Sequence, residues 1–281
     1  MMSQTPASPA LASTAVGELL CGRVQDATVF ASTGVASYLA VPEPRSSTAV
    51  VALLTEQAVR LPIGVTVAAE KLPQVGEAVR IGDGSIVARD RTWRPVRWWD
   101  PRPHVAAEDL FRHGAKLFAV LEDEPSSAFG FPLADALNVA RALAEGDALP
   151  ALEVVGLGPG LTPAADDVVA GALAVLALCG RLHDAVRVAV DFHASTHTTA
   201  LSAALLAAAG KGQVIPQASA VLTALATGGE PVRLRLAAAG LFSVGGTSGH
   251  DLCVGMAGIL AGSVLTGGLR PNGEAVSRSP R

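Results

Sequence analysis

Aromatic and charged residues are scarce in this chain of 281 residues. Aromatics make up 4% and charged residues 16%, whereas apolar residues make up 50%. The core must therefore be built from Ala, Val and Leu, which favours helices that pack closely through small residues. The net charge of −4 and the lack of a Lys/Arg cluster leave no basic surface for nucleic acid, so we expect no nucleic-acid partner.

Cysteine is also rare, and its pattern argues against a metal site. Cys21, Cys179 and Cys253 are far apart, with no CxxC pair and no histidine at zinc-binding spacing. The first 16 residues lack the basic segment and apolar core of a signal peptide. We expect a cytoplasmic protein with no cofactor and name no residue as a metal ligand, and metal dependence stays open.

Long hydrophobic runs are nearly absent, with one exception. Residues 252–269 carry no charge over a length that approaches a membrane span. Five glycines and two hydroxyl residues in this run argue against insertion. We expect a buried central helix and no membrane contact.

The region from residue 18 to 100 shows short β-rich runs separated by turn signals. The predicted strands are Val24–Ala31, Ser37–Val41, Thr48–Leu54, Ile63–Ala68, Ala78–Ile81, Ser85–Ala88 and Thr92–Trp99. Gly82-Asp83-Gly84 is a hairpin signal. A strand about every ten residues predicts a small barrel or sandwich. Residues 1–17 are expected to form a disordered lead.

After Pro103 the apolar period changes to about 3.6 residues, as in helices. One helix is expected to bury Leu110, Gly114, Leu117 or Phe118, and Leu121. Residues 122–132 are expected to be a linker before a second helix. We therefore predict an α+β protein, in which a small β-barrel or sandwich-like domain precedes a mostly helical domain over residues 104–270. Residues 271–281 are expected to form a disordered tail.

The most informative stretch is Gly156-Leu157-Gly158-Pro159-Gly160-Leu161-Thr162-Pro163-Ala164-Ala165-Asp166-Asp167. It is a glycine-rich loop leading into a helix, in which Thr162 suits the N-cap, Pro163 suits the first helical position and Gly180 ends the helix. Glycines at 156, 158 and 160 expose backbone N–H groups, and the helix N-terminus adds positive potential. This pattern predicts binding of a phosphate or carboxylate, with Gly158, Gly160 and Thr162 as contacts.

Asp166 and Asp167 complicate that prediction. Adjacent residues lie about 100° apart around a helix, so both side chains cannot face one point, and either carboxylate would repel a bound anion. At least one is expected to act on a metal, a cationic group or a proton, or to stabilise the helix N-terminus.

Two later stretches have similar chemistry. Residues 193–199 are expected to precede a helix over 200–209, and residues 245–251 a helix that begins at Leu252. If the three helix starts converge, they form a pocket rich in N–H and O–H donors.

The candidate catalytic residues are Asp167, His250 and Asp251. The candidate substrate-binding residues are Gly158, Gly160, Thr162, Asp166, His197, Thr198, Thr199, Thr247 and Ser248. The alternative for the histidines is a surface or cap position, and for Asp251 it is dipole stabilisation.

Common catalytic motifs are missing. The sequence has no GxxxxGK[ST], no GxSxG and no HExxH, and the GxG at residues 156–158 does not extend to GxGxxG. We therefore do not expect a nicotinamide enzyme.

Residues 156–167 resemble the hallmark Gly-Leu-Gly-Pro-Gly-Leu-Thr-Pro-Ser-Gly-Asp-Asp of the AllH-like family, which includes a subunit of bacterial oxamate carbamoyltransferase. Ala164 and Ala165 stand where Ser-Gly is usual. Residues 198–202 and 246–251 look like the family's second and third blocks, and the resemblance extends over most of the chain.

The resemblance implies a role in purine or allantoin nitrogen catabolism, in which a carbamoyl group moves between oxalurate and phosphate. It also implies partner subunits and an anionic substrate such as carbamoyl phosphate, phosphate or a carboxylate. Two other readings stay open: a non-catalytic binding or scaffold subunit, and a stand-alone transferase or hydrolase for another small carboxylate. The small-residue helices are compatible with a homo-oligomer.

Overall fold

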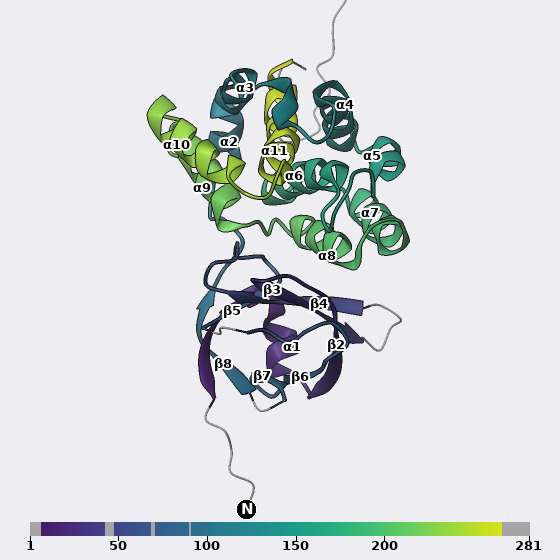
Figure 1. The fold of residues 1–281 in the computed structure, drawn as a ribbon. Coiled ribbons are helices and arrows are strands. Elements are labelled where there is room, and N and C mark those ends of the chain that lie inside the picture. Colours follow the sequence, from purple (N-terminus) through teal and green to yellow (C-terminus); the bar gives the residue numbers. More distant parts are fainter. Residues whose placement is uncertain (1–6, 43–47, 69–70, 90, 266–281) are drawn as a thin grey trace, which may run out of the picture.

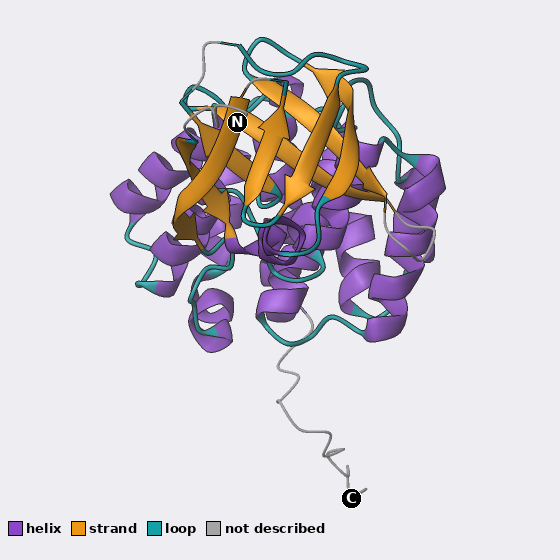
Figure 2. Ribbon diagram, turned by 90° about the horizontal axis from the view of Figure 1, so that it is seen from below, coloured by secondary structure: helices purple, strands orange, loops and turns teal. Residues whose placement is uncertain are grey.

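The computed structural model describes residues 7–42, 48–68, 71–89 and 91–265. A β-barrel forms the N-terminal part, and helices form the part that follows (Figure 1). Seen from below, the strands cross in front of the helices (Figure 2). The predicted α+β class, a small barrel followed by a mostly helical part, is confirmed.

In the described part of the chain, eight strands close the barrel in the order β1-β5-β4-β3-β2-β6-β7-β8. They are β1 (Ser8–Ser13), β2 (Gln25–Ser32), β3 (Ala36–Pro42), β4 (Thr48–Thr55), β5 (Gly64–Val67), β6 (Ala78–Gly82), β7 (Ser85–Ala88) and β8 (Arg91–Trp99). The pairs β1–β8 and β4–β5 are parallel and the others antiparallel. Leu39, Leu53 and Ile81 point inward and are fully buried, so the closed sheet encloses its own apolar core.

The barrel includes residues that we expected to be disordered. β1 pairs with β5 and β8, and the 3₁₀ turn Thr14–Val16 and helix α1 (Gly17–Cys21) follow it directly. The prediction of a disordered lead is therefore wrong for residues 8–17. These residues are ordered because Ala10, Ala12 and Leu20 are buried in the barrel core. Residues 1–6 of that lead lie outside the described residues.

Seven residues separate the end of β8 from the first helix of the helical part. Its α-helices are α2 (Ala107–His113), α3 (Ala115–Glu122), α4 (Leu133–Ala144), α5 (Leu149–Val154), α6 (Ala164–Leu178), α7 (Asp184–His197), α8 (Ala200–Ala209), α9 (Pro216–Ala226), α10 (Pro231–Phe242) and α11 (Ser248–Leu265). The first expected helix is interrupted at Gly114, where an added Cβ would lie 2.6 Å from Leu260 Cβ. Its apolar stripe of Leu110, Leu117 and Leu121 is buried as expected. The short helix α5 was not expected.

Helices α6 and α11 cross at the centre of the helical part, and small residues allow their backbones to touch. A Cβ added at Gly255 would lie 2.0 Å from the carbonyl oxygen of Val168, and one at Gly171 would lie 2.1 Å from that of Leu252. Cys253, Met256 and Leu260 of α11 are fully buried. α11 is thus the buried central helix that we predicted.

The barrel and the helices are packed together through α8. Leu201 and Ala208 on α8 belong to the buried core of the barrel. Near the expected boundary, Pro101 accepts a hydrogen bond from Val214 N at 2.9 Å, and Arg102 donates to the carbonyl oxygen of Lys211 at 2.9 Å. The domain boundary at residues 100–104 stays a prediction. The expected disordered tail over 271–281 lies outside the described residues.

None of the helices in the described ranges combines the length and the apolar character that crossing a bilayer requires. Residues 266–269 of the uncharged run fall outside these ranges.

Candidate functional site

The glycine-rich loop adopts the backbone conformation that its glycines predict. The φ angles of Gly156, Gly158 and Gly160 are +89°, +125° and +93°, in the region that other residues rarely adopt. A Cβ at Gly156 would lie 2.1 Å from the carbonyl oxygen of His197. Glycine at 156 therefore lets the loop lie directly on the end of α7.

Helix α6 starts one residue later than predicted, and Thr162 does not cap it. Pro163 occupies the N-cap position with extended dihedral angles, φ −55° and ψ 141°, and no side chain caps the helix. Thr162 Oγ1 instead lies 3.3 Å from Ser248 Oγ at the start of α11. At the other end, Gly180 has φ +65° directly after the C-cap Cys179, as predicted.

Asp166 connects the loop to the start of α8. Its carboxylate, only 1% exposed, accepts hydrogen bonds from Gly156 N at 2.7 Å, from Ser202 Oγ at 2.6 Å and from Thr198 Oγ1. Both oxygens are thus used by donors of the protein itself. In this arrangement Asp166 and Thr198 position the loop, and their direct contact with a substrate stays a prediction.

Thr199 caps α8, accepting from Ser202 N at 3.0 Å, and donates to the carbonyl oxygen of Leu161 at 2.5 Å. It therefore holds the far end of the glycine loop, as Asp166 holds the near end. The expected helix over residues 200–209 is confirmed, and the Thr199 hydroxyl caps it.

His197 is placed differently from our prediction. Residues 193–197 form the last turn of α7 and not a loop, because Ser195 and Thr196 donate to the carbonyl oxygens of Phe192 and His193 and so fit within the helix. The His197 ring is exposed and stacks on His193 at 3.7 Å. Its backbone carbonyl oxygen lies against Gly156 of the loop.

Helix α11 starts earlier than predicted, at Ser248 and not at Leu252. His250 and Asp251 therefore lie in its first turn. Asp251 is fully buried and accepts hydrogen bonds from Gly130 N at 3.0 Å and from Phe131 N at 3.2 Å. Burial raises the pKa of Asp251, whereas hydrogen bonds from Thr247, Phe131 and Gly130 and the charge of His250 lower it. A Cβ at Gly130 would lie 2.3 Å from Thr247 Oγ1, so the loop before α4 can approach α11 only through a glycine.

His250 packs between two aromatic rings. It stacks on Phe242 at 4.1 Å and meets Phe129 edge-on at 5.9 Å. Its Nε2 lies 3.4 Å from Glu124 Oε2, and its buried Nδ1 has no hydrogen-bond partner among the described residues.

Asp167 lies between the starts of α6 and α11 and is mostly buried. Burial raises its pKa to about 8; a hydrogen bond from Ser248 lowers it, and the charges of Asp251 and Asp166 raise it further. Its buried Oδ2 has no hydrogen-bond partner in the described part of the chain. Near neutral pH Asp167 is therefore largely protonated, with one oxygen uncommitted.

The two adjacent aspartates thus face different neighbours, as their helical spacing predicts. Asp166 faces α8 and Asp167 faces α11. The starts of α6, α8 and α11 do converge, through the contacts of Asp166 with Ser202 and of Thr162 with Ser248. The repulsion expected between an anion and these carboxylates is reduced, because Asp166 accepts three hydrogen bonds from the protein and burial raises the pKa of Asp167 to about 8.

Three backbone hydrogen-bond donors remain free in the loop before α6. The backbone N–H groups of Gly158, Gly160 and Thr162 make no hydrogen bond within the described ranges. These N–H groups line the loop that leads into α6, where the helix dipole favours an anion. Among the residues that the structure covers, no cluster of three or more His, Cys, Asp or Glu is arranged to hold a metal ion.

Sequence reasoning missed three contributors: Glu124, Gly130 and Phe131. All belong to the segment that we expected to be a linker. Their contacts are with α11, more than a hundred residues away. Of these three residues, only Gly130 gave a signal in the sequence, because it is an isolated glycine before a helix. That signal was too general to indicate a site.

The raised pKa of Asp167 predicts a pH-dependent stability. An unfolded aspartate titrates near pH 3.9, so between about pH 4 and 8 the folded protein binds one more proton than the unfolded protein. The contribution of this group to stability is thus fully present at low pH and is lost as the pH rises towards 8. Asp167→Asn, which resembles the neutral acid, should be more stable than the wild type by at least about 2 kcal/mol at pH 8, with a smaller gain at pH 5.

Thermal unfolding of both proteins from pH 5 to 9 measures this effect. Asp135→Asn, which changes an exposed aspartate in the first turn of α4, is the matched control and should show no pH-dependent gain. Parallel curves for the wild type and Asp167→Asn would contradict a raised pKa.

Comparison with known proteins supports the resemblance for part of the chain. Residues 154–260 match the model of the family described as oxamate carbamoyltransferase subunit AllH. The match includes α6, α8, most of α11 and the loops before them, and does not extend to the β-barrel, although we expected resemblance over most of the chain. No curated protein gave a significant match. No solved structure did so either.

Proposed function

We propose that this chain is a subunit of a carbamoyltransferase that moves a carbamoyl group between oxalurate and phosphate, with its site where α6, α8 and α11 begin. The observation that carries the proposal is the position of Asp167: a mostly buried carboxyl with an uncommitted buried oxygen, in the first turn of α6 after a loop of free N–H groups. Burial also raises its pKa to about 8. The family match over residues 154–260 supports the choice of reaction.

The proposed chemistry uses these groups as follows. A phosphate oxygen attacks the carbamoyl carbon of oxalurate, a C–O bond forms and the C–N bond to the oxamate nitrogen breaks. Asp167 gives its proton to that nitrogen and takes up the proton of the phosphate, so the products are carbamoyl phosphate and oxamate. The N–H groups of Gly158 and Gly160, with Thr162 and Ser248, hold the anion and stabilise negative charge on the reacting oxygen.

The other candidates receive supporting roles in this proposal. We assign the proton to Asp167 and not to His250, because His250 is packed against Phe242 and faces Glu124. Asp251 fixes the loop at Gly130 and Phe131, and its charge helps to raise the pKa of Asp167. A role in purine or allantoin nitrogen catabolism and a cytoplasmic location belong to the same proposal, and the three free cysteines suit a reducing compartment.

The decisive test is the turnover of Asp167→Asn in the enzyme assembled with its partner subunits. Asparagine has no carboxyl proton to transfer, so we expect kcat for carbamoyl phosphate formation to fall about 100-fold with little change in KM. Asp135→Asn should keep full activity. Full turnover by Asp167→Asn would remove Asp167 from the mechanism.

A second measurement separates this proposal from a non-catalytic scaffold. Phosphate, carbamoyl phosphate, oxamate and oxalurate are added one at a time to the isolated chain, and its thermal unfolding is followed. A ligand at 100 times its Kd should stabilise the chain by about 2.7 kcal/mol, and the effect should change in Asp167→Asn. No shift with any of the four would favour the scaffold, or a site completed by a partner.

A further inference from the structure

Two histidines in the last turn of α7 lie ring against ring. His193 and His197 are four residues apart and therefore share one face of the helix. Their ring centroids are 3.7 Å apart, and the ring planes differ by 8°. Among the described residues no other two histidine rings are in contact. His197 is exposed and His193 is partly buried, so an ion in solution can reach the pair.

The backbone determines which nitrogen of His197 carries a proton. Nδ1 of His197 lies 3.0 Å from the carbonyl oxygen of His193, and a carbonyl oxygen can only accept a hydrogen bond. The proton is therefore on Nδ1, where the Thr196 hydroxyl oxygen at 2.9 Å is a second acceptor. In the neutral ring the lone pair is then on Nε2, which has no partner among the described residues. Histidines that bind metals are held in the same way, by an N–H group donated to a backbone carbonyl.

The separation of the two rings is close to the separation that one metal ion requires. With Zn–N bonds of about 2.1 Å at a tetrahedral angle, two ligand nitrogens lie about 3.4 Å apart. The rings, at 3.7 Å, reach this distance by a small rotation of either side chain. The ring nitrogens of His193 have no hydrogen-bond partner in the described ranges, so no such contact opposes the rotation.

The end of the helix favours a cation at this position. His197 is the last residue of α7 and Thr198 is the C-cap, and the C-terminal end of a helix dipole is negative. This end of α7 also contacts the glycine loop, because the carbonyl oxygen of His197 lies against Gly156 and Thr198 donates to Asp166. An ion bound to the two histidines would therefore restrain the turn of α7 on which the loop lies.

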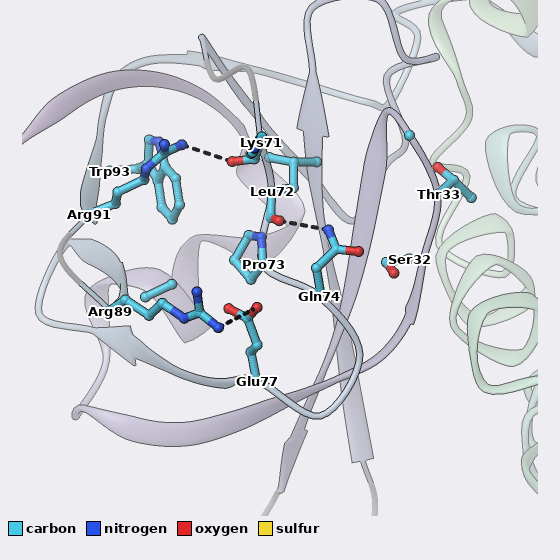
Figure 3. A pocket seen from close by; sticks show the side chains of 12 residues that line it. Ser32, Thr33, Lys71, Leu72, Pro73, Gln74, Glu77, Arg89, Arg91 and Trp93 are labelled. Atoms are coloured by element: carbon cyan, nitrogen blue, oxygen red, sulfur yellow. Dashed lines mark hydrogen bonds and ion pairs between the residues drawn. The ribbon is translucent and has the colours of Figure 1, made fainter.

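The barrel cavity offers no comparable set of ligands. It has a volume of about 690 Å³, and its described lining contains neither histidine nor cysteine (Figure 3). The Glu77 carboxylate in its wall pairs with Arg89 at 2.9 Å. An ion that prefers nitrogen ligands should therefore select the histidine pair on α7.

We propose that His193 and His197 bind one divalent first-row transition metal ion, of the class of Zn²⁺, Ni²⁺ and Cu²⁺, with water in the remaining positions. His197 binds it through Nε2. Imidazole nitrogen suits these ions, whereas Mg²⁺ and Ca²⁺ prefer oxygen ligands. Two protein ligands make an exchangeable site and not a structural one on which folding depends. The site rests on the geometry of α7 and not on the proposed transferase activity.

The test is isothermal titration calorimetry of the full chain, produced without a histidine tag, with zinc chloride and with nickel chloride. We expect one Zn²⁺ or Ni²⁺ ion to bind per chain, and an excess of Mg²⁺ to leave that binding unchanged. His193→Ala and His197→Ala should each weaken the binding at least about tenfold. The controls His104→Ala and Cys21→Ser change an exposed imidazole and an exposed thiol elsewhere, and each should alter the affinity less than about twofold.

A second readout separates metal binding from folding. Without metal, the Tm of His197→Ala should stay within about 3 °C of the wild type, because the ring is exposed and alanine suits a helix. In the electron paramagnetic resonance spectrum of the Cu²⁺ complex, the wild type should show splitting from two nitrogens and His197→Ala from fewer. The proposal is overturned if neither Zn²⁺ nor Ni²⁺ binds, or if either control weakens the binding as much as His197→Ala does.

Discussion

Gly255→Ala should lower the free energy of unfolding by about 3–4 kcal/mol, although alanine is the better helix former. The new Cβ would lie 2.0 Å from the carbonyl oxygen of Val168 and 2.9 Å from Ala172 N, so α11 and α6 would have to move apart. Backbone atoms cannot turn aside as a flexible side chain can, and overpacking at a close helix crossing is costly. Thermal or urea unfolding of the purified protein measures this loss.

Gly240→Ala is the matched control. Gly240 is also within a helix, α10, but a Cβ at that position meets nothing within 4 Å. The substitution should therefore stabilise the protein by about 0.5–1 kcal/mol, through helix propensity alone. The same change should thus have opposite signs at the two positions. Equal effects would mean that α6 and α11 do not touch at Gly255.

The second large effect is expected at Asp166. Asp166→Ala leaves Gly156 N, Thr198 Oγ1 and Ser202 Oγ without their acceptor in a buried site, and each unpaired buried donor costs about 1–3 kcal/mol. We expect a total loss of about 3–5 kcal/mol, which corresponds to a fall of roughly 10 °C in the Tm.

Asp135→Ala is the control, since Asp135 is an exposed aspartate in the first turn of α4 and has no hydrogen bond or ion pair with another described residue. Its loss should cost less than about 1 kcal/mol. If Asp166→Ala were as mild as Asp135→Ala, the carboxylate would not hold the glycine loop to α8. An Asp166→Ala protein with the expected loss of stability should also show increased hydrogen exchange at residues 156–162.

The sequence was sufficient to predict those elements of the fold that are determined by residues close together in the chain. Seven strands were predicted within a few residues of their observed bounds, because alternating side chains and turn residues such as Asp83 and Gly84 specify hairpins locally. β1 was missed because Ser8–Ser13 is short and rich in small residues, and its stability comes from pairing with β5 and β8, which lie far along the chain. The sequence offered the convergence of three helix starts only as a condition, and the tertiary contacts of Asp166 with Ser202 and of Thr162 with Ser248 bring these starts together.

For the site, the sequence determined the types of residue and the glycine conformations, because φ > 0 at Gly156, Gly158 and Gly160 is a property of the residue itself. It also determined that Asp166 and Asp167 face different directions, because helical spacing is local. Which aspartate is held by three hydrogen bonds and which has a raised pKa was decided only by tertiary structure. Hydrogen-bond donors and desolvation come from α8 and α11, and a carboxyl's pKa depends on these distant neighbours and not on its place in the chain.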